Sequence, residues 1–216
     1  MNDSSRRHAN TGPETDPSGA PDIISLGAEH PIWNRFFHVA PLIVVGTREA
    51  DGGYDLAPKH MAAPMGWGNY FGFVCTPAHR TYHNAKREGT FTVSYPRPSQ
   101  VLTASLAAAP RCEGDEKPSL KALRTFPARV VDGVLLEDGY LHLECETHKV
   151  VDGFDENSLI TGKVVQAHVA AAAIRTADVD DQDLILRAPL LVYLAPGRYA
   201  EVSESFAFPF HAGWSR

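Results

Sequence analysis

Two polar segments of the chain contain residues that can bind an anion. The first, residues 55–61, reads Asp-Leu-Ala-Pro-Lys-His-Met and follows an Asp-Gly-Gly turn. The second is Arg80-Thr81, which follows an apolar run and precedes a short polar stretch of helical composition. An arginine can hold a phosphate through two hydrogen bonds, and the first N–H groups of a helix also favour phosphate. Together the two segments predict a site for a phosphorylated ligand.

Residues 55–61 have the composition of a loop that could bind a flat ring. Pro58 fixes its own φ angle and restricts Ala57, so the backbone is expected to be extended here. An extended loop can present N–H and C=O groups to the polar edge of such a ring. Lys59 and His60 could approach a phosphate from the same loop. The alternative interpretation is an ordinary surface turn between two strands.

The second segment is expected to begin a helix. Thr81 is a residue type that favours the N-cap position, and residues 82–87 would then form the helix. Arg80 would lie beside N–H groups that have no partner within the helix, and the helix dipole would add to the attraction for an anion. The alternative is a capped helix whose cations are simply solvated.

Cys75 and Thr76 end an apolar run beside this predicted site. A catalytic thiolate needs an electropositive, exposed setting and usually a base, and no such pattern surrounds Cys75, so we expect it to be buried and inert. The ten histidines have no HExxH or Cys-x-x-Cys framework with them, so no metal site is expected. His60 is the histidine best placed for an electrostatic or proton-transfer role.

The elements that must position these residues are mostly strands. Six stretches have strand composition, and Asp-Gly turns punctuate them, whereas the helical stretches are short. Antiparallel strands with turns at short intervals predict a mostly β fold, a barrel with peripheral helices. The expected strands cover residues 42–46, 70–76, 91–95, 129–136, 140–151 and 159–169, and the expected helices cover 81–87, 101–109 and 119–123.

Composition and charge limit the possible classes of function. The 216 residues suffice for one domain, expected over residues 21–216, after a flexible polar tail at residues 1–20. A net charge of −6 argues against a nucleic-acid or anionic-membrane binder, and no apolar run approaches the roughly 20 residues of a membrane span. The polar N-terminal segment does not read as a secretory signal, and three scattered cysteines fit a reducing cytoplasm.

The last part of this domain is a C-terminal extension unusually rich in aromatic residues, 206–214. Exposed aromatic side chains at this density suggest burial against a partner subunit. The alternative is that the extension packs on its own barrel.

The order of these motifs resembles the flavin reductase-like family, the FMN-binding split barrels. The resemblance spans about residues 29–198, and the chain departs from the usual pattern at Asp55, normally Asn, and at His60, normally Ser. The matching positions are Gly46-Thr47, Asp51-Gly52, Asp55-Leu56-Ala57-Pro58, Thr81, Phe91-Thr92-Val93-Ser94, Glu116-Lys117, Leu143-Glu144-Cys145, Gly162-Lys163-Val164-Val165, Pro189-Leu190-Leu191 and Gly197-Arg198-Tyr199.

The resemblance implies a Greek-key split barrel and an oxidoreductase that moves a hydride from NAD(P)H to FMN, with FAD as a possible replacement. It also implies a homodimer, transient nicotinamide binding without a Rossmann motif, and a possible partner monooxygenase. His60 is the expected catalytic residue. The expected flavin-binding residues are Asp55, Leu56, Ala57, Pro58, Lys59, His60, Met61, Cys75, Thr76, Arg80 and Thr81.

Three other interpretations remain open at this point. A non-catalytic flavin or ligand carrier could use the same barrel, and His60 in place of the usual Ser is the feature that supports this alternative. An enzyme similar to the pyridoxamine-phosphate oxidases would share the barrel, but its usual Arg/Lys phosphate cluster is not evident. An interaction protein without a cofactor is the third.

Overall fold

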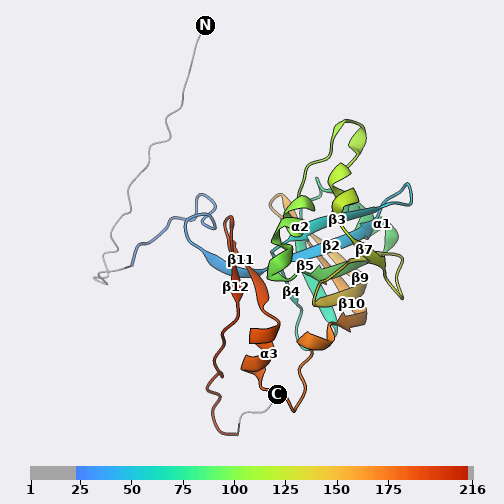
Figure 1. The fold of residues 1–216 in the computed structure, drawn as a ribbon. Helices are drawn as coiled ribbons and strands as arrows, with labels where there is room; N and C mark the ends of the chain where they lie inside the picture. Colours follow the sequence, from blue (N-terminus) through green and yellow to red (C-terminus); the bar gives the residue numbers. More distant parts are fainter. Residues whose placement is uncertain (1–22, 214–216) are drawn as a thin grey trace.

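The computed structural model describes residues 23–213, and its largest element is a curled antiparallel sheet of seven strands (Figure 1). Its strands are β2 (Ile43–Arg48), β3 (Tyr54–Lys59), β4 (Ala62–Pro64), β5 (Tyr70–Cys75), β6 (Thr90–Tyr95), β9 (Leu141–Phe154) and β10 (Asn157–Val169). Their order across the sheet is β3-β2-β6-β9-β10-β5-β4. This arrangement confirms the predicted mostly β fold with peripheral helices. The tail expected at residues 1–20 lies outside the described residues.

The inner face of the curled sheet forms the main hydrophobic core. Side chains alternate between the two faces of a strand, so every second residue points inward. The buried rings of Phe73 on β5 and Phe91 on β6 meet edge to face, with their centroids 5.2 Å apart. Gly162 on β10 leaves room for the Phe91 ring, because a Cβ at this position would lie 2.6 Å from ring atoms. The core is therefore packed closely around Phe91.

Helix α1 (Arg80–Glu88) follows β5 and packs on the barrel through Tyr82 and Ala85. It ends at Gly89, whose φ of 69° places it in the left-handed region that favours glycine. The helix expected over residues 81–87 is thus confirmed, with one more residue at each end.

Two further helices lie outside the sheet. Helix α2 (Val101–Leu106) is shorter than the expected 101–109, and four short 3-10 segments accompany the helices. Helix α3 (Asp181–Arg187) has no counterpart among the expected helices, although the Asp180 carboxylate caps it by accepting from Gln182 N at 2.8 Å. The 3-10 segments are η1 (Pro98–Gln100), η2 (Glu113–Asp115), η3 (Pro118–Ala122) and η4 (Ala171–Ala173).

A second sheet lies beside the barrel and was not expected. It has the order β1-β11-β12, from β1 (His38–Pro41), β11 (Leu190–Ala195) and β12 (Arg198–Val202) (Figure 1). Its surroundings expose large apolar side chains that the barrel does not cover. These include Trp33, Phe36, Phe37, Val39, Tyr199, Phe206, Phe208 and Phe210. The described part of the C-terminal aromatic extension is therefore not buried on its own barrel.

Residues 54–59 form strand β3 rather than the predicted loop. They pair with β2 over its whole length, from Arg48 opposite Tyr54 to Ile43 opposite Lys59. β3 is an edge strand of the sheet, and a proline such as Pro58 is tolerated at an edge because its missing N–H leaves no ladder bond unmade. The strand was not predicted, because proline and charged residues are uncommon in strands.

The strand expected over residues 129–136 is also shorter than predicted. Only β8 (Val134–Leu136) forms, and it pairs with β7 (Thr125–Pro127). Residues 129–131 instead donate their three N–H groups to the buried carboxylate of Glu144, at 2.6 to 2.9 Å, and His168 Nε2 lies 2.7 Å from the same carboxylate. These bonds outweigh burial and lower the pKa of Glu144 to about 2.

A second buried polar group, His142, makes folding sensitive to acid. Its ring is buried on β9, with Nδ1 3.1 Å from Ser94 Oγ, and burial lowers its pKa from 6.5 to about 4. Between pH 4 and pH 6.5, His142 is mostly protonated in the unfolded chain and mostly neutral in the folded chain. Stability due to His142 is therefore complete above pH 6.5 and is lost as the pH falls towards 4.

We expect His142→Gln to remove this part of the pH dependence. The slope between pH 6.5 and 4 should flatten by up to about 1.4 kcal/mol per pH unit, even if the variant is less stable overall. Urea unfolding at several pH values measures this. His30→Gln, at an exposed position, is the control and should keep the wild-type slope. Equal slopes for the wild type and His142→Gln would contradict the assignment.

Candidate functional site

A cleft of about 770 Å³ runs along the free edge of β3. Its other walls are the N-terminal end of α1 and the segment 107–117. The cleft brings together part of the predicted site, although residues 62–79 separate the two polar segments in the sequence. The predicted residues that line it are Asp55, Ala57, Pro58, Lys59, Arg80 and Thr81.

The backbone of β3 offers polar groups to this cleft. The carbonyl of Leu56 accepts a hydrogen bond from Lys117 Nζ at 2.7 Å, which shows that this carbonyl faces the free edge. The N–H and C=O of one residue in an antiparallel strand point the same way, and the direction alternates along the strand. The C=O of Pro58 therefore also faces the edge. The Leu56 side chain lies in a separate apolar cluster with Ala104 and Leu136.

The carboxylate of Asp55 is buried in the wall of the cleft and is held by two cations. Only 4% of the residue is exposed, and its Oδ1 lies 3.2 Å from Lys117 Nζ and 3.3 Å from an Arg111 guanidinium nitrogen. Arg111 also pairs with Glu49. A buried carboxylate is stable only with such partners, so these ion pairs tie β3 to the segment that carries Arg111 and Lys117.

Sequence reasoning missed Arg111 altogether and noted Lys117 only as a position of the resemblance. The only sequence feature that pointed to these cations was Asp55, a carboxylate at a position where the family usually has Asn. A buried charge requires a cation, but the sequence does not show which of the 20 lysines and arginines supplies it. The separation of 56 to 62 residues makes these contacts invisible to local patterns.

The N-terminal end of α1 also faces the cleft. The helix begins at Arg80 with His79 as the N-cap, so the predicted N-cap role of Thr81 is wrong. His79 has the extended backbone that an N-cap needs, whereas Thr81 is a buried residue inside the first turn. No side chain caps this end, and no acidic residue lies in its first turn. The start of the helix therefore keeps its attraction for an anion.

Arg80 is paired in the structure with Asp115 from the segment opposite. The Arg80 and Asp115 side chains are 44% and 46% exposed, whereas those of Lys117 and Asp55 are 7% and 5% exposed. An exposed ion pair contributes about 0–1 kcal/mol, so its arginine can exchange one anion for another at little cost. The pair of Lys117 and Asp55, by contrast, is buried, so Lys117 is not free to bind another anion.

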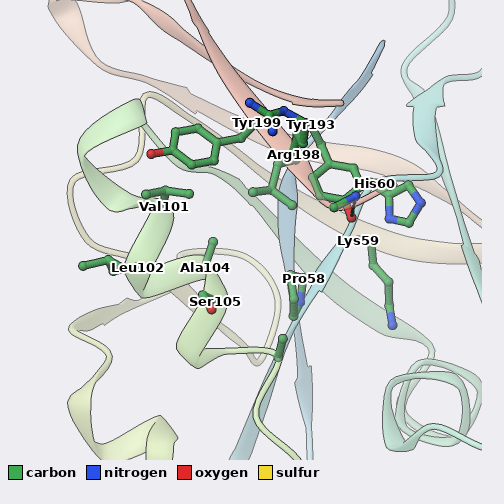
Figure 2. A pocket seen from close by; sticks show the side chains of 13 residues that line it. Pro58, Lys59, His60, Val101, Leu102, Ala104, Ser105, Tyr193, Arg198 and Tyr199 are labelled. Carbon is green, nitrogen blue, oxygen red and sulfur yellow. Dashed lines mark hydrogen bonds between the residues drawn. The ribbon is translucent and has the colours of Figure 1, made fainter. Parts of the chain in front are cut away.

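His60, the predicted catalytic residue, lies in a neighbouring cleft of about 540 Å³ that shares Pro58 and Lys59 with the first (Figure 2). Its ring stacks at a tilt on Tyr193, with the centroids 4.8 Å apart. Burial, followed by the nearby His38 and Lys59, lowers the pKa of His60 below its usual 6.5. A neutral imidazole at pH 7 can accept or pass on a proton. Its catalytic role stays a prediction.

The remaining predicted residues lie outside the two clefts. Cys75 is 2% exposed within the main core, and burial raises the pKa of its thiol, as expected of an inert cysteine. Thr76 Oγ1 accepts from Ala78 N at 3.3 Å, in the turn that leads to α1. Met61 is exposed on the turn after β3. Their binding roles stay predictions.

Residues 23–213 contain neither a metal-binding cluster nor a membrane-spanning helix. No group of three or more His, Cys, Asp or Glu side chains in this part of the chain is placed to hold a metal ion. Within the same range, no helix is both long and apolar enough to cross a membrane.

Comparison with known proteins gives one family and many related folds. The family described as "Flavin reductase like domain" matches residues 35–203, whereas no curated protein matches the chain. Flavoredoxin of Desulfovibrio vulgaris shares 19% identity over 88% of this chain and 100% of its own, with a TM-score of 0.70. Nitrilotriacetate monooxygenase component B from Bacillus cereus shares 19% over 79% and 88%, with a TM-score of 0.68.

An NADH:FAD oxidoreductase from Streptomyces globisporus is 14% identical over 76% of this chain and 86% of its own, with a TM-score of 0.61. At these identities the solved structures establish the fold. A Shewanella frigidimarina structure whose title gives a split barrel domain has a TM-score of 0.69 at 14% identity, covering 80% of this chain and 87% of that chain. The predicted split barrel is thereby confirmed.

The Lys117–Asp55 pair gives a test of how the cleft wall is held. We expect Lys117→Met to lower the free energy of unfolding by about 3–5 kcal/mol, because it removes one cation from a buried carboxylate. Adding Asp55→Asn to this variant should restore most of the loss. Denaturant unfolding measures both, and Lys121→Met, at an exposed position four residues further along the chain, serves as control. A double variant no more stable than Lys117→Met would contradict this account.

Proposed function

The chain belongs to the flavin reductase like domain family, and from this premise we propose that it binds FMN and transfers hydride from NAD(P)H to that flavin. The observation that carries the proposal is the cleft along β3, where an uncapped helix start and a cluster of cations meet free backbone groups. Bound FMN would supply the redox chemistry by accepting a hydride at ring atom N5.

The residues present fit the phosphate of FMN. Arg80 carries a guanidinium that can bind a phosphate in bidentate fashion, and its exposed partner Asp115 is easily exchanged. The first N–H groups of α1 point to the same place and have no capping side chain. Arg80 and the start of α1 would therefore hold the phosphate, with Thr81 forming the floor.

The edge of β3 fits the polar side of the ring. The carbonyl of Pro58 faces the cleft beside that of Leu56, which Lys117 already occupies, and residues 107–109 on the opposite wall are alanines with short side chains. Lys59 lines the cleft at the same strand end, where its charge would stabilise negative charge on a bound ring. His60, neutral at pH 7 in its neighbouring cleft, would take or give a proton there.

FAD remains the second candidate for the flavin. A further cleft of about 560 Å³ adjoins the first and shares Arg80, Arg111, Asp115 and Lys117 with it. This space would take the longer end of a dinucleotide. The relative named as an NADH:FAD oxidoreductase supports keeping this candidate.

The proposed assembly is a cytoplasmic homodimer. The uncovered apolar side chains of residues 33–39, together with Phe206, Phe208 and Phe210, would pack against a second copy. The relatives named as monooxygenase component B support a partner monooxygenase as the destination of the reduced flavin. A carrier without reductase activity would use the same cleft, and the activity measurement below separates the two.

We expect the purified protein to retain FMN after desalting and to lose the flavin absorption bands when NADH or NADPH is added. The donor that bleaches the bands is the physiological one. Visible spectroscopy under exclusion of oxygen measures this. Retained flavin that neither donor bleaches would favour the carrier, and failure to retain or turn over FMN would refute the proposal.

We expect Arg80→Gln to raise the Kd for FMN by about 10- to 100-fold, since it removes a charge-assisted contact to phosphate. Riboflavin, which lacks the phosphate, should bind the variant as well as the wild type. Quenching of flavin fluorescence measures both. Arg87→Gln, at the other end of α1, is the matched control. Equal losses for FMN and riboflavin would show that Arg80 does not contact the phosphate.

A further inference from the structure

The cleft that contains His60 has a composition different from that of the flavin cleft. It lies between helix α2 and the hairpin of β11 and β12 (Figure 2). Thirteen residues line it, among them Lys59 and Arg198, and none is Asp or Glu. The chain as a whole has 26 acidic residues and a net charge of −6. The absence of acidic residues from this lining makes the cleft locally positive, which favours an anionic ligand.

Arg198 is the cation in this cleft that is available to a ligand. It lies on β12 and forms no ion pair with any residue in the described range 23–213. Lys59 in Figure 2 extends away from the hairpin, and it forms a hydrogen bond with Cys75. An unpaired guanidinium presents a planar fork that matches a carboxylate through two parallel hydrogen bonds.

The rest of the cleft is suited to a flat apolar ring. Tyr199 is 55% exposed and its ring lies above Val101 of α2 (Figure 2), and Leu102 on the same helix is 76% exposed. On the other side, Tyr193 and His60 stack on each other. Tyr193 is fixed in place, because its hydroxyl accepts a hydrogen bond from Gly197 N at 2.7 Å. A ring that enters between these groups meets one wall, Tyr193, that is already in position, which limits the entropy lost on binding.

We propose that this second cleft binds a planar aromatic carboxylate, with its carboxylate on Arg198 and its ring against Tyr199 and the side chains of α2. A volume of about 540 Å³ accommodates one or two fused rings with a carboxylate. The binding site itself does not depend on flavin chemistry, whereas a role of the bound acid as a substrate of the adjoining cleft rests on the proposed function.

The test uses 1-naphthoate as the probe and 1-naphthamide as its neutral counterpart with the same ring. Isothermal calorimetry on the full chain, with and without FMN, gives both Kd values. We expect the acid to bind about tenfold more tightly than the amide, because only the acid forms charge-assisted hydrogen bonds. Cyclohexanecarboxylate, which is not planar, should bind more weakly than naphthoate.

Two variants of exposed residues assign the binding to this cleft. Arg198→Ala should remove the preference for acid over amide, and Tyr199→Ala should weaken both ligands several-fold while keeping the preference. Arg187→Ala, on the exposed side of α3, is the matched control and should behave as the wild type. Equal affinity for acid and amide, or a preference that survives Arg198→Ala, overturns the proposal.

The outcome is distinguishable from that of the flavin proposal. Arg198-dependent naphthoate binding by a chain that does not retain FMN would support this site and refute the flavin proposal. FMN retention without naphthoate binding would refute this site alone. If NADH displaces naphthoate and itself binds more tightly, with both lost in Arg198→Ala, the cleft is a nicotinamide nucleotide site and the proposal is overturned.

Discussion

The buried carboxylate of Asp55 is the constraint on which the flavin cleft depends. A charge in this position must have cations beside it, and Lys117 and Arg111 supply them from a segment far along the chain. That requirement pulls residues 107–117 against the edge strand, and the space between the two becomes the cleft. The departure from Asn at this position therefore does not disturb the site. It replaces an amide by an ion pair that holds the opposite wall.

The edge position of β3 has a functional meaning beyond the topology of the sheet. A free edge carries N–H and C=O groups without a hydrogen-bond partner in the sheet. Other parts of the protein can cover these groups, or a ligand can bind to them. Here Lys117 covers one carbonyl, that of Leu56, and the proline at position 58 removes one N–H. The partly covered edge cannot pair with another strand along its length, but it can still bond to the polar side of a planar molecule.

Much of the fold could be predicted because its strands carry their own signal. The apolar runs of β2, β5, β6, β9 and β10 and the turns between them determine a mostly β fold. β3 could not be recognised, since Pro58 is acceptable in a strand only at an edge, and edge position is a property of the whole sheet. Only part of the site could be predicted, because its other residues depend on contacts between distant segments. Residues 55–59 and 80–81 meet as expected, whereas Arg111, Lys117 and Tyr193 come from segments whose contacts no local pattern reveals.

The ion pair between Arg80 and Asp115 balances the positive charge of the cleft when no ligand is bound. The arginine already has a carboxylate at its side, so the protein carries its own counter-ion for the position where a phosphate would bind. Ligand entry then exchanges one anion for another instead of adding an anion to an unbalanced cation. The arginine would then have an anionic partner both with and without a bound phosphate. Selectivity would come from what a phosphate monoester offers beyond the single carboxylate that it displaces, namely a greater charge and a third oxygen.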